Sequence, residues 1–138
     1  MKTCLVLEGG AMRGMYTAGV LDVFYRAGIH FDGIIGVSAG AAFGVNYLSR
    51  QPGRVIRYSK RFNSNHDYMG LLPLLKSGNI INTAYAYDKV PRELDPFDGD
   101  TFDASGVPFW VVVTNLETGK PEYIRLEHSM AQMDAIRA

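Results

Sequence analysis

The chain has 138 residues, of which 47% are hydrophobic, and its fourteen basic residues balance fourteen acidic ones. This length can enclose one compact core but is too short for two ordinary domains, so we expect a single domain over residues 1–138. A formal net charge of zero gives no electrostatic attraction to a nucleic-acid backbone. We therefore expect no nucleic-acid partner.

Cysteine content and hydropathy restrict the compartment. Cys4 is the only cysteine, which excludes an internal disulfide framework and any multi-cysteine zinc site, and favours a reducing compartment. The first residues lack the long apolar core of a secretory signal, and no run approaches the roughly 18 to 20 apolar residues that span a bilayer. These features predict a cytoplasmic protein without a metal site, and they leave peripheral contact with a membrane open.

Two strand-helix units occupy the first third of the chain. Residues 4–7 are an apolar run that ends at a glycine turn, and residues 15–27 carry apolar side chains at helical spacing. Residues 34–37 form a second apolar run, and residues 39–48 continue helically. Two such units in succession favour a parallel sheet with right-handed crossovers and hence an α/β domain.

The middle of the chain has weaker signals. Residues 54–62 are compatible with a short helix, and residues 82–94 with a partly helical segment. Residues 63–78 mix turn residues with the apolar stretch MGLLPLL, which we interpret as a core segment in preference to a lipid-contacting one. Residues 95–106 are rich in Asp, Gly and Pro, and predict a loop.

The C-terminal part predicts a hairpin and a helix. Residues 109–114, FWVVVT, are the strongest strand signal there, and their aromatic residues, together with Tyr123, are expected in the core or the sheet. Residues 117–120 predict a hairpin turn into a strand over residues 123–126. Ser129 is a candidate cap for a last helix over residues 130–138.

Residues 36–40, GVSAG, place Ser38 in a GxSxG motif between a predicted strand and a predicted helix. In that context a sharp strand-to-helix turn lifts the serine side chain out of the sheet, where it can act as a nucleophile. Gly36 and Gly40 permit close backbone packing, and the positive end of the following helix favours developing negative charge. The alternative is that Ser38 only caps the helix, so a second motif is needed to decide.

Residues 8–14, EGGAMRG, form a glycine loop at the end of the first predicted strand, beside Ser38 if the two strands are neighbours. Attack of a serine on an ester creates an oxyanion, and backbone N–H groups of such a loop can stabilise it. The spacing GGxxxG does not match the dinucleotide fingerprint, and Met15 and Tyr16 stand where a phosphate-binding loop needs Lys and then Ser or Thr. Nucleotide binding is therefore the weakest interpretation.

The order of these motifs, EGGAMRG followed by GVSAG, resembles the start of patatin-like phospholipases. Residues 17–21, TAGVL, and residues 113–119, VTNLETG, also resemble segments of that family, whereas residues 51–103 have no clear match. The resemblance makes Ser38 the nucleophile. It assigns the oxyanion loop and the supporting motif positions to Gly9, Gly10, Ala11, Arg13, Gly14, Gly36 and Gly40.

The resemblance also implies the fold and the activity. The expected fold is a three-layer α/β architecture with a parallel or mixed sheet flanked by helices. The expected activity is that of a serine lipid acyl hydrolase of the phospholipase or esterase type, which acts on lipid or acyl esters without a cofactor.

In this family the base of a Ser-Asp dyad follows a segment similar to RASxxxP, in a DGG or DGA motif. Residues 136–138 stand where that segment would begin, so the resemblance implies that residues 1–138 are the N-terminal portion of a domain that is incomplete at its C-terminus. The dyad aspartate would then lie beyond Ala138, and these residues alone would have little activity. Asp32-Gly33 and Asp98-Gly99 are better interpreted as turns.

Two alternatives remain open at this stage. The family usually has a third glycine where this chain has Ala11, and a positive φ there would strain an alanine. This departure and the missing base motivate an inactive patatin-fold binding or regulatory module. Ser38, Asp103 and His128 also occur in the chain order of an α/β-hydrolase triad, although that fold normally reaches its nucleophile after more strands.

Overall fold

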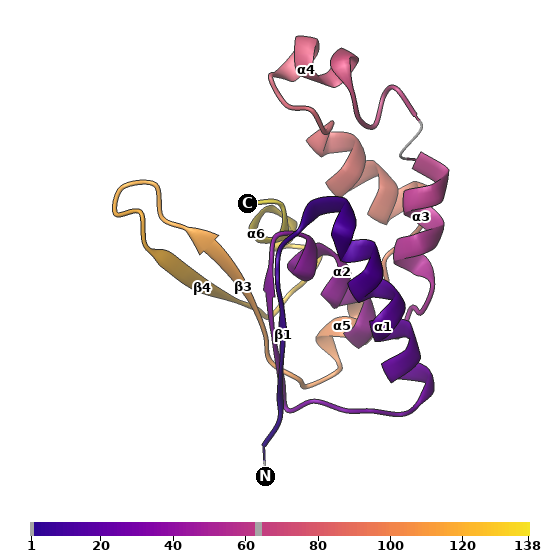
Figure 1. Cartoon of the computed structure of the whole chain (residues 1–138), viewed down its shortest axis with the longest axis vertical. Helices are drawn as coiled ribbons and strands as arrows, with labels where there is room; N and C mark the ends of the chain where they lie inside the picture. Colours follow the sequence, from indigo (N-terminus) through magenta and orange to yellow (C-terminus); the bar gives the residue numbers. More distant parts are fainter. Residues whose placement is uncertain (1, 63–64) are drawn as a thin grey trace.

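The computed structural model describes residues 2–62 and 65–138, so positions 63 and 64 of the predicted turn region lie outside the described residues. Figure 1 shows the whole chain. In chain order the elements are β1 (Cys4–Leu7), η1 (Ala11–Arg13), α1 (Gly14–Arg26), β2 (Gly33–Val37), α2 (Ala39–Leu48), α3 (Arg54–Phe62), α4 (Leu71–Ser77), η2 (Tyr85–Leu94), α5 (Gly99–Asp103), β3 (Phe109–Thr114), β4 (Pro121–Leu126) and α6 (Met133–Arg137).

The four strands form one mixed sheet in the order β1-β2-β3-β4. β1, β2 and β3 are parallel, and β4 returns antiparallel to β3 after a turn in which the Asn115 side chain accepts two backbone hydrogen bonds. The predicted neighbourhood of the first two strands and the predicted hairpin are both confirmed. The fold is therefore α/β, as expected, with a mixed sheet flanked by helices.

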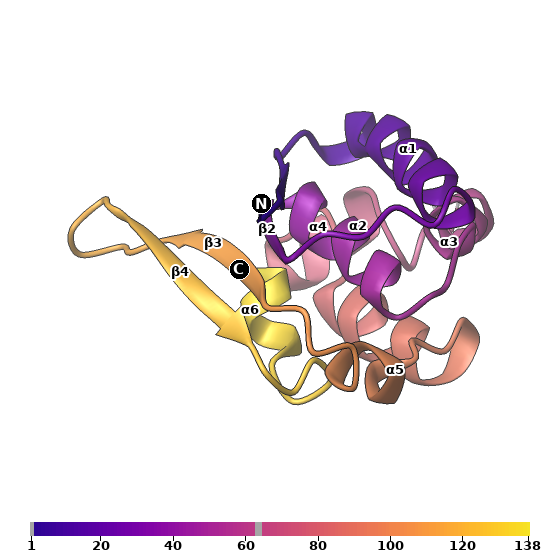
Figure 2. The same ribbon diagram turned by 90° about the horizontal axis from the view of Figure 1, so that it is seen from below.

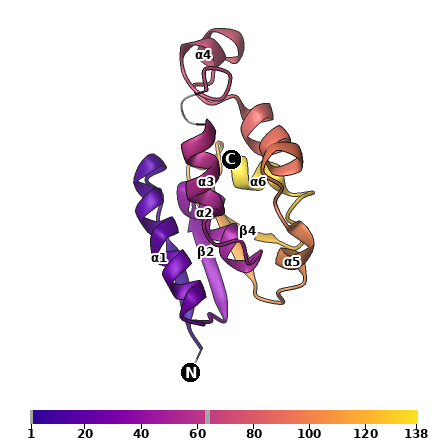
Figure 3. The ribbon, with the colours of Figure 1, turned by 90° about the vertical axis from the view of Figure 1, so that its right-hand side faces the viewer.

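The helices pack against one face of this sheet. Because β1, β2 and β3 follow one another in the same direction, right-handed crossovers put α1 and α2 on the same side, as Figures 2 and 3 show. Leu7, Ile34 and Phe109 point to that side and are buried. On the opposite face, Val6 and Tyr123 are 67% and 61% exposed. Of the three layers expected, the described residues supply the sheet and one helical layer.

Helix α2 lies unusually close to the strands. A methyl group added to Gly40 would lie 2.3 Å from the carbonyl oxygen of Leu7, and one added to Gly36 would lie 2.6 Å from Cα of Ala41. Backbone atoms cannot move aside as the end of a flexible side chain can. Both positions therefore require glycine, and the contact places the start of α2 against the end of β1.

The Gly40→Ala substitution should destabilise the fold by about 3 kcal/mol or more, because the new methyl group overlaps a backbone carbonyl. Gly19→Ala is the matched control. Gly19 lies inside α1 with no atom within 4 Å of an added methyl group, so alanine should stabilise by about 0.5 to 1 kcal/mol. Urea unfolding of both variants measures the difference, and equal effects would contradict this account of the packing.

The segment between residues 82 and 106 is more regular than its sequence indicates. The partly helical prediction for residues 82–94 corresponds to η2, a π-helix that contains Pro91, and a hydrogen bond from Asp95 N to Val90 O closes it at 2.9 Å. The loop predicted over residues 95–106 is wrong in part, because α5 forms within it. Asp98 caps α5 by accepting hydrogen bonds from the backbone N and the hydroxyl of Thr101.

The last predicted helix is shorter than expected. α6 begins at Met133 instead of residue 130, and Ser129 does not cap it. The Ser129 amide and hydroxyl both donate to Asp103 Oδ1 at 2.9 Å, because Ser129 is fully buried and needs a partner there. Of the helices that the structure describes, none is long and apolar enough to cross a bilayer.

Candidate active site

Ser38 occupies the turn between β2 and α2 in a rare backbone conformation. Its φ is 51° and its ψ is −119°, outside the regions that residues with a side chain normally adopt. The side chain makes no capping hydrogen bond to α2, and the residue is exposed, so the capping alternative is wrong. A strained serine that points away from its own helix is the geometry of a nucleophile turn.

The glycine loop lies against this serine. A methyl group added to Gly9 would lie 3.3 Å from Ser38 Cβ, which shows that the two motifs meet. The backbone N–H groups of Gly9 and Gly10 donate to no other described residue. These N–H groups are therefore available to a bound group beside Ser38, as an oxyanion site requires.

Ala11 and Arg13 complete the loop. Ala11 has a φ of 47°. A positive φ strains an alanine, whereas the glycine that the family usually has at this position would adopt it freely. Arg13 is exposed, its N–H donates to Gly10 O at 2.9 Å, and its side chain folds back over Gly10. The loop is thus compact, and Ala11 holds it at a conformational cost.

The Ala11→Gly substitution should stabilise the protein by about 1 kcal/mol, because glycine adopts a positive φ without steric cost. Ala27 has a negative φ of −80° at the end of α1, so Ala27→Gly should be neutral or slightly destabilising. Thermal unfolding compares the two variants. A loss of stability in Ala11→Gly as large as in Ala27→Gly would mean that Ala11 carries no strain.

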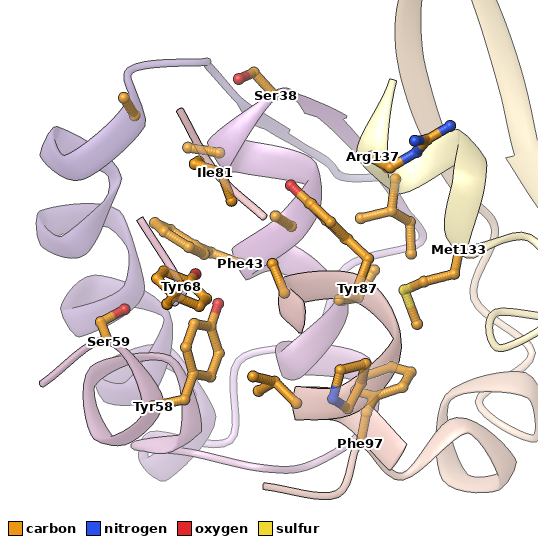
Figure 4. Close-up of a pocket in the computed structure, with 18 of the residues that line it drawn as sticks. Ser38, Phe43, Tyr58, Ser59, Tyr68, Ile81, Tyr87, Phe97, Met133 and Arg137 are labelled. Carbon is orange, nitrogen blue, oxygen red and sulfur yellow. The ribbon is translucent and has the colours of Figure 1, made fainter. Parts of the chain in front are cut away.

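A cavity of about 280 Å³ opens beside Ser38, close to the lower limit of about 300 Å³ for small-molecule sites. Figure 4 shows Ser38 at one end of it and Tyr58 and Phe97 at the other. Its walls come from α2, α3, η2, α6 and the loops between them. Apolar side chains form most of the lining and include Phe43, Val45, Val90, Phe97, Met133 and Ile136.

Three tyrosines supply much of the polar surface in the cavity. Burial raises the pKa of Tyr58, Tyr68 and Tyr87 above the ordinary value for a phenol. All three hydroxyl groups therefore stay protonated at neutral pH, and none is a phenolate base. No aspartate, glutamate or histidine among the described residues lines the cavity. The apolar part of the lining suits an acyl chain, and the charged side chains of the described lining are Arg54 and Arg137.

A buried ion pair closes the deep end of the cavity. Arg54 is only 4% exposed, and it lies 3.3 Å from Asp95 Oδ1 and donates to Asn46 Oδ1 at 2.8 Å. Burial lowers the pKa of the Arg54 guanidinium, and the negative charge of Asp95 opposes this effect. Arginine remains charged under such conditions, so the pair ties α2, α3 and the segment after η2 together.

The Asp95→Ala substitution should destabilise the protein by about 3 to 5 kcal/mol, because it leaves the Arg54 charge buried without its ionic partner. Arg57 also binds Asp95, with two contacts of 2.8 Å, but its side chain is 56% exposed. Arg57→Ala leaves the buried pair intact and should cost about 1 kcal/mol or less. Urea unfolding distinguishes the two, and a similar cost for both would contradict the role of Arg54.

The Ser-Asp-His alternative fails on position. Phe109 pairs with Ile34 on one side and with Leu126 on the other, so Asp103 and His128 lie at the edge of the sheet where β2 begins. Ser38 lies at the opposite edge, about 13 Å farther along at roughly 3.3 Å per residue. Instead, His128 lies 3.6 Å from Asp103 in an exposed pair.

The walls of the cavity are not predicted from the sequence. Val55, Tyr58, Ser59 and Phe62 recur at helical spacing on α3, and this stripe was the available signal that one face of the helix is covered. The tyrosines beyond α3 have no comparable pattern. They become neighbours through aromatic contacts between distant segments, such as that of Tyr68 with Tyr85.

The fold and the site define an α/β protein with a strained serine turn at the mouth of an apolar cavity. The family model of patatin-like phospholipases matches residues 5–135, and the chain belongs to that family.

The chain is also similar to the Escherichia coli (strain K12) protein named "Uncharacterized protein YjjU", with 32% identity over 142 residues. That match covers 99% of this chain and 39% of the relative. The chain thus spans less than half of the length of this relative.

Proposed function

We propose that the whole protein is a serine lipid acyl hydrolase in which Ser38 is the nucleophile. The observation that carries this proposal is the strained, uncapped Ser38 beside the Gly9 loop and at the mouth of an apolar cavity. Each feature has a separate use in acyl transfer: attack, stabilisation of the oxyanion and binding of the acyl chain. Their convergence at one end of the sheet supports a single site.

The oxyanion contacts follow from the backbone. We assign them to the N–H groups of Gly9 and Gly10, with Ala11 and Arg13 holding the loop in place. The start of α2 adds a favourable dipole, because its first N–H groups point towards the serine turn. Loss of one oxyanion donor costs about 10²- to 10³-fold in rate in serine hydrolases.

The base in this proposal is an aspartate outside residues 1–138, because no acidic or histidine side chain among the described residues lines the cavity. Ser38 Oγ bonds to the ester carbonyl carbon while its proton passes to the aspartate. The C–O bond to the alcohol then breaks, and the alcohol leaves with that proton. Water, activated by the same aspartate, hydrolyses the acyl-enzyme and restores Ser38.

Covalent labelling of the whole protein with a fluorophosphonate tests the nucleophile. Labelling and turnover of a soluble short-chain ester should both disappear in Ser38→Ala, with a fall in rate of at least about 10⁴-fold. Ser105→Ala is the control, because Ser105 lies outside the cavity and before β3. Labelling that persists in Ser38→Ala would refute the assignment.

The alternative is a patatin-fold binding or regulatory module without turnover, and the strained Ala11 is the observation that favours it. A folded wild-type protein that binds lipid, takes no fluorophosphonate label and hydrolyses no ester would establish this alternative. Turnover that depends on Ser38 would exclude it.

A further inference from the structure

Helix α4 lies at one extreme of the molecule (Figure 1), and exposed aliphatic side chains are concentrated on it and just after it. We call it the leucine patch. It consists of Leu71, Leu72, Leu74, Leu75, Ile80 and Ile81, all of which are exposed. Single exposed leucines are ordinary, but six exposed aliphatic side chains within eleven positions concentrate apolar area that a protein in water normally buries. The interpretation of this stretch as core is therefore wrong.

The leucine patch is held on a defined support. Met69 and Ile81 form a β-bridge at its base, Gly70 N donates to Ile80 O at 2.9 Å, and Asn82 N donates to Tyr68 O at 2.9 Å. Below this bridge, the ring of Tyr68 packs against those of Phe62 and Tyr85. The chain thus closes into a loop whose leucines are exposed.

The patch is continuous with the cavity. Met69 and Ile81, at the base of the loop, both line the cavity that opens at Ser38. In Figure 4, Ile81 lies near the Ser38 end of this space. An apolar surface therefore leads from the exposed leucines through Met69 and Ile81 to the cavity, whose charged side chain near the Ser38 end is Arg137.

The chemistry of the patch favours lipid over protein. Its members are all leucine or isoleucine, whereas protein interfaces concentrate their energy in Trp, Tyr and Arg, and leucine is under-represented there. α4 has seven residues and is about 10 Å long, which is small for a stable protein interface. Between the bridged residues Met69 and Ile81 the loop carries a single charged residue, Lys76, so apolar insertion dominates.

We infer that the leucine patch inserts into the surface of a phospholipid bilayer and holds the mouth of the Ser38 cavity against the lipid. This inference rests on the proposed function for the fate of the lipid, but binding to the bilayer can be measured without turnover. Because the six side chains of the patch are all uncharged, a zwitterionic bilayer suffices.

Sedimentation of the whole protein with phosphatidylcholine vesicles tests the inference in a Ser38→Ala background, which prevents turnover. Adding Leu71→Asp and Leu75→Asp, at positions 75% and 83% exposed, should lower the partition coefficient at least about tenfold. The matched control adds Leu116→Asp. Leu116 is 98% exposed in the β3–β4 turn, far from the cavity lining, and its replacement should change partitioning less than about twofold.

Several results would overturn the inference. They are equal partitioning of the double variant and its background, an equal loss in the Leu116→Asp control, or no vesicle binding by the background protein. A change from dimer to monomer in the double variant with unchanged vesicle binding would assign the patch to self-association instead. Leu75→Asp alone, checked for native thermal unfolding, provides a milder variant that should still lower partitioning about threefold.

The two proposals fail separately. If vesicle binding depends on the leucine patch but fluorophosphonate labelling persists in Ser38→Ala, the docking surface stands and the nucleophile assignment is rejected. If hydrolysis of a soluble ester depends on Ser38 but the patch substitutions leave vesicle binding unchanged, the nucleophile assignment stands and the docking surface is rejected.

Discussion

The approach of α2 to the backbone of β1 and β2 is the contact on which the site depends. The Leu7 carbonyl occupies the space that a side chain at Gly40 would need, and Ala41 does the same at Gly36. With α2 seated this deeply, the chain has only one residue, Ser38, in which to reverse direction, and that residue takes a positive φ. The same contact brings the end of β1, and hence Gly9, beside the serine.

The mouth of the cavity is formed by residues that are close in sequence, whereas its walls bring together residues that are far apart in sequence. The serine turn and the glycine loop are local features of the first fifty residues. The walls of the cavity combine α2 with α3, η2 and α6, and the last two are distant from it in sequence. The buried pair of Arg54 and Asp95 joins these parts, with Asn46 as the contact on α2. A charge is acceptable at this depth because hydrogen bonds and an opposite charge replace the lost water. The leucine patch extends the apolar surface outward from the cavity.

Much of the fold was predictable where local signals agreed. The first two strand-helix units, the β3–β4 hairpin and the meeting of the two glycine motifs follow from apolar runs, glycines and turn residues that act over a few positions. The helix α5 was missed because Asp, Gly and Pro indicate loops, and only the Asp98 cap favours a helical turn. The stretch at α4 was predicted to lie in the core because its residues are hydrophobic. Hydrophobicity alone does not determine whether a side chain is buried, since burial also depends on which other segments pack against it. The roles of Ser38, Gly9, Gly10, Ala11 and Arg13 stay predictions.

The sequence by itself determined that this is an α/β protein of the patatin-like phospholipase family with Ser38 in a strand-to-helix turn, because glycine spacing and apolar periodicity act locally along the chain. Only the tertiary structure decided that Ala11 has a positive φ, that Asp103 and His128 lie at the far edge of the sheet, and that an apolar cavity leads outward to exposed leucines. These facts depend on which distant segments share space, and such neighbours leave no periodic trace in a single sequence.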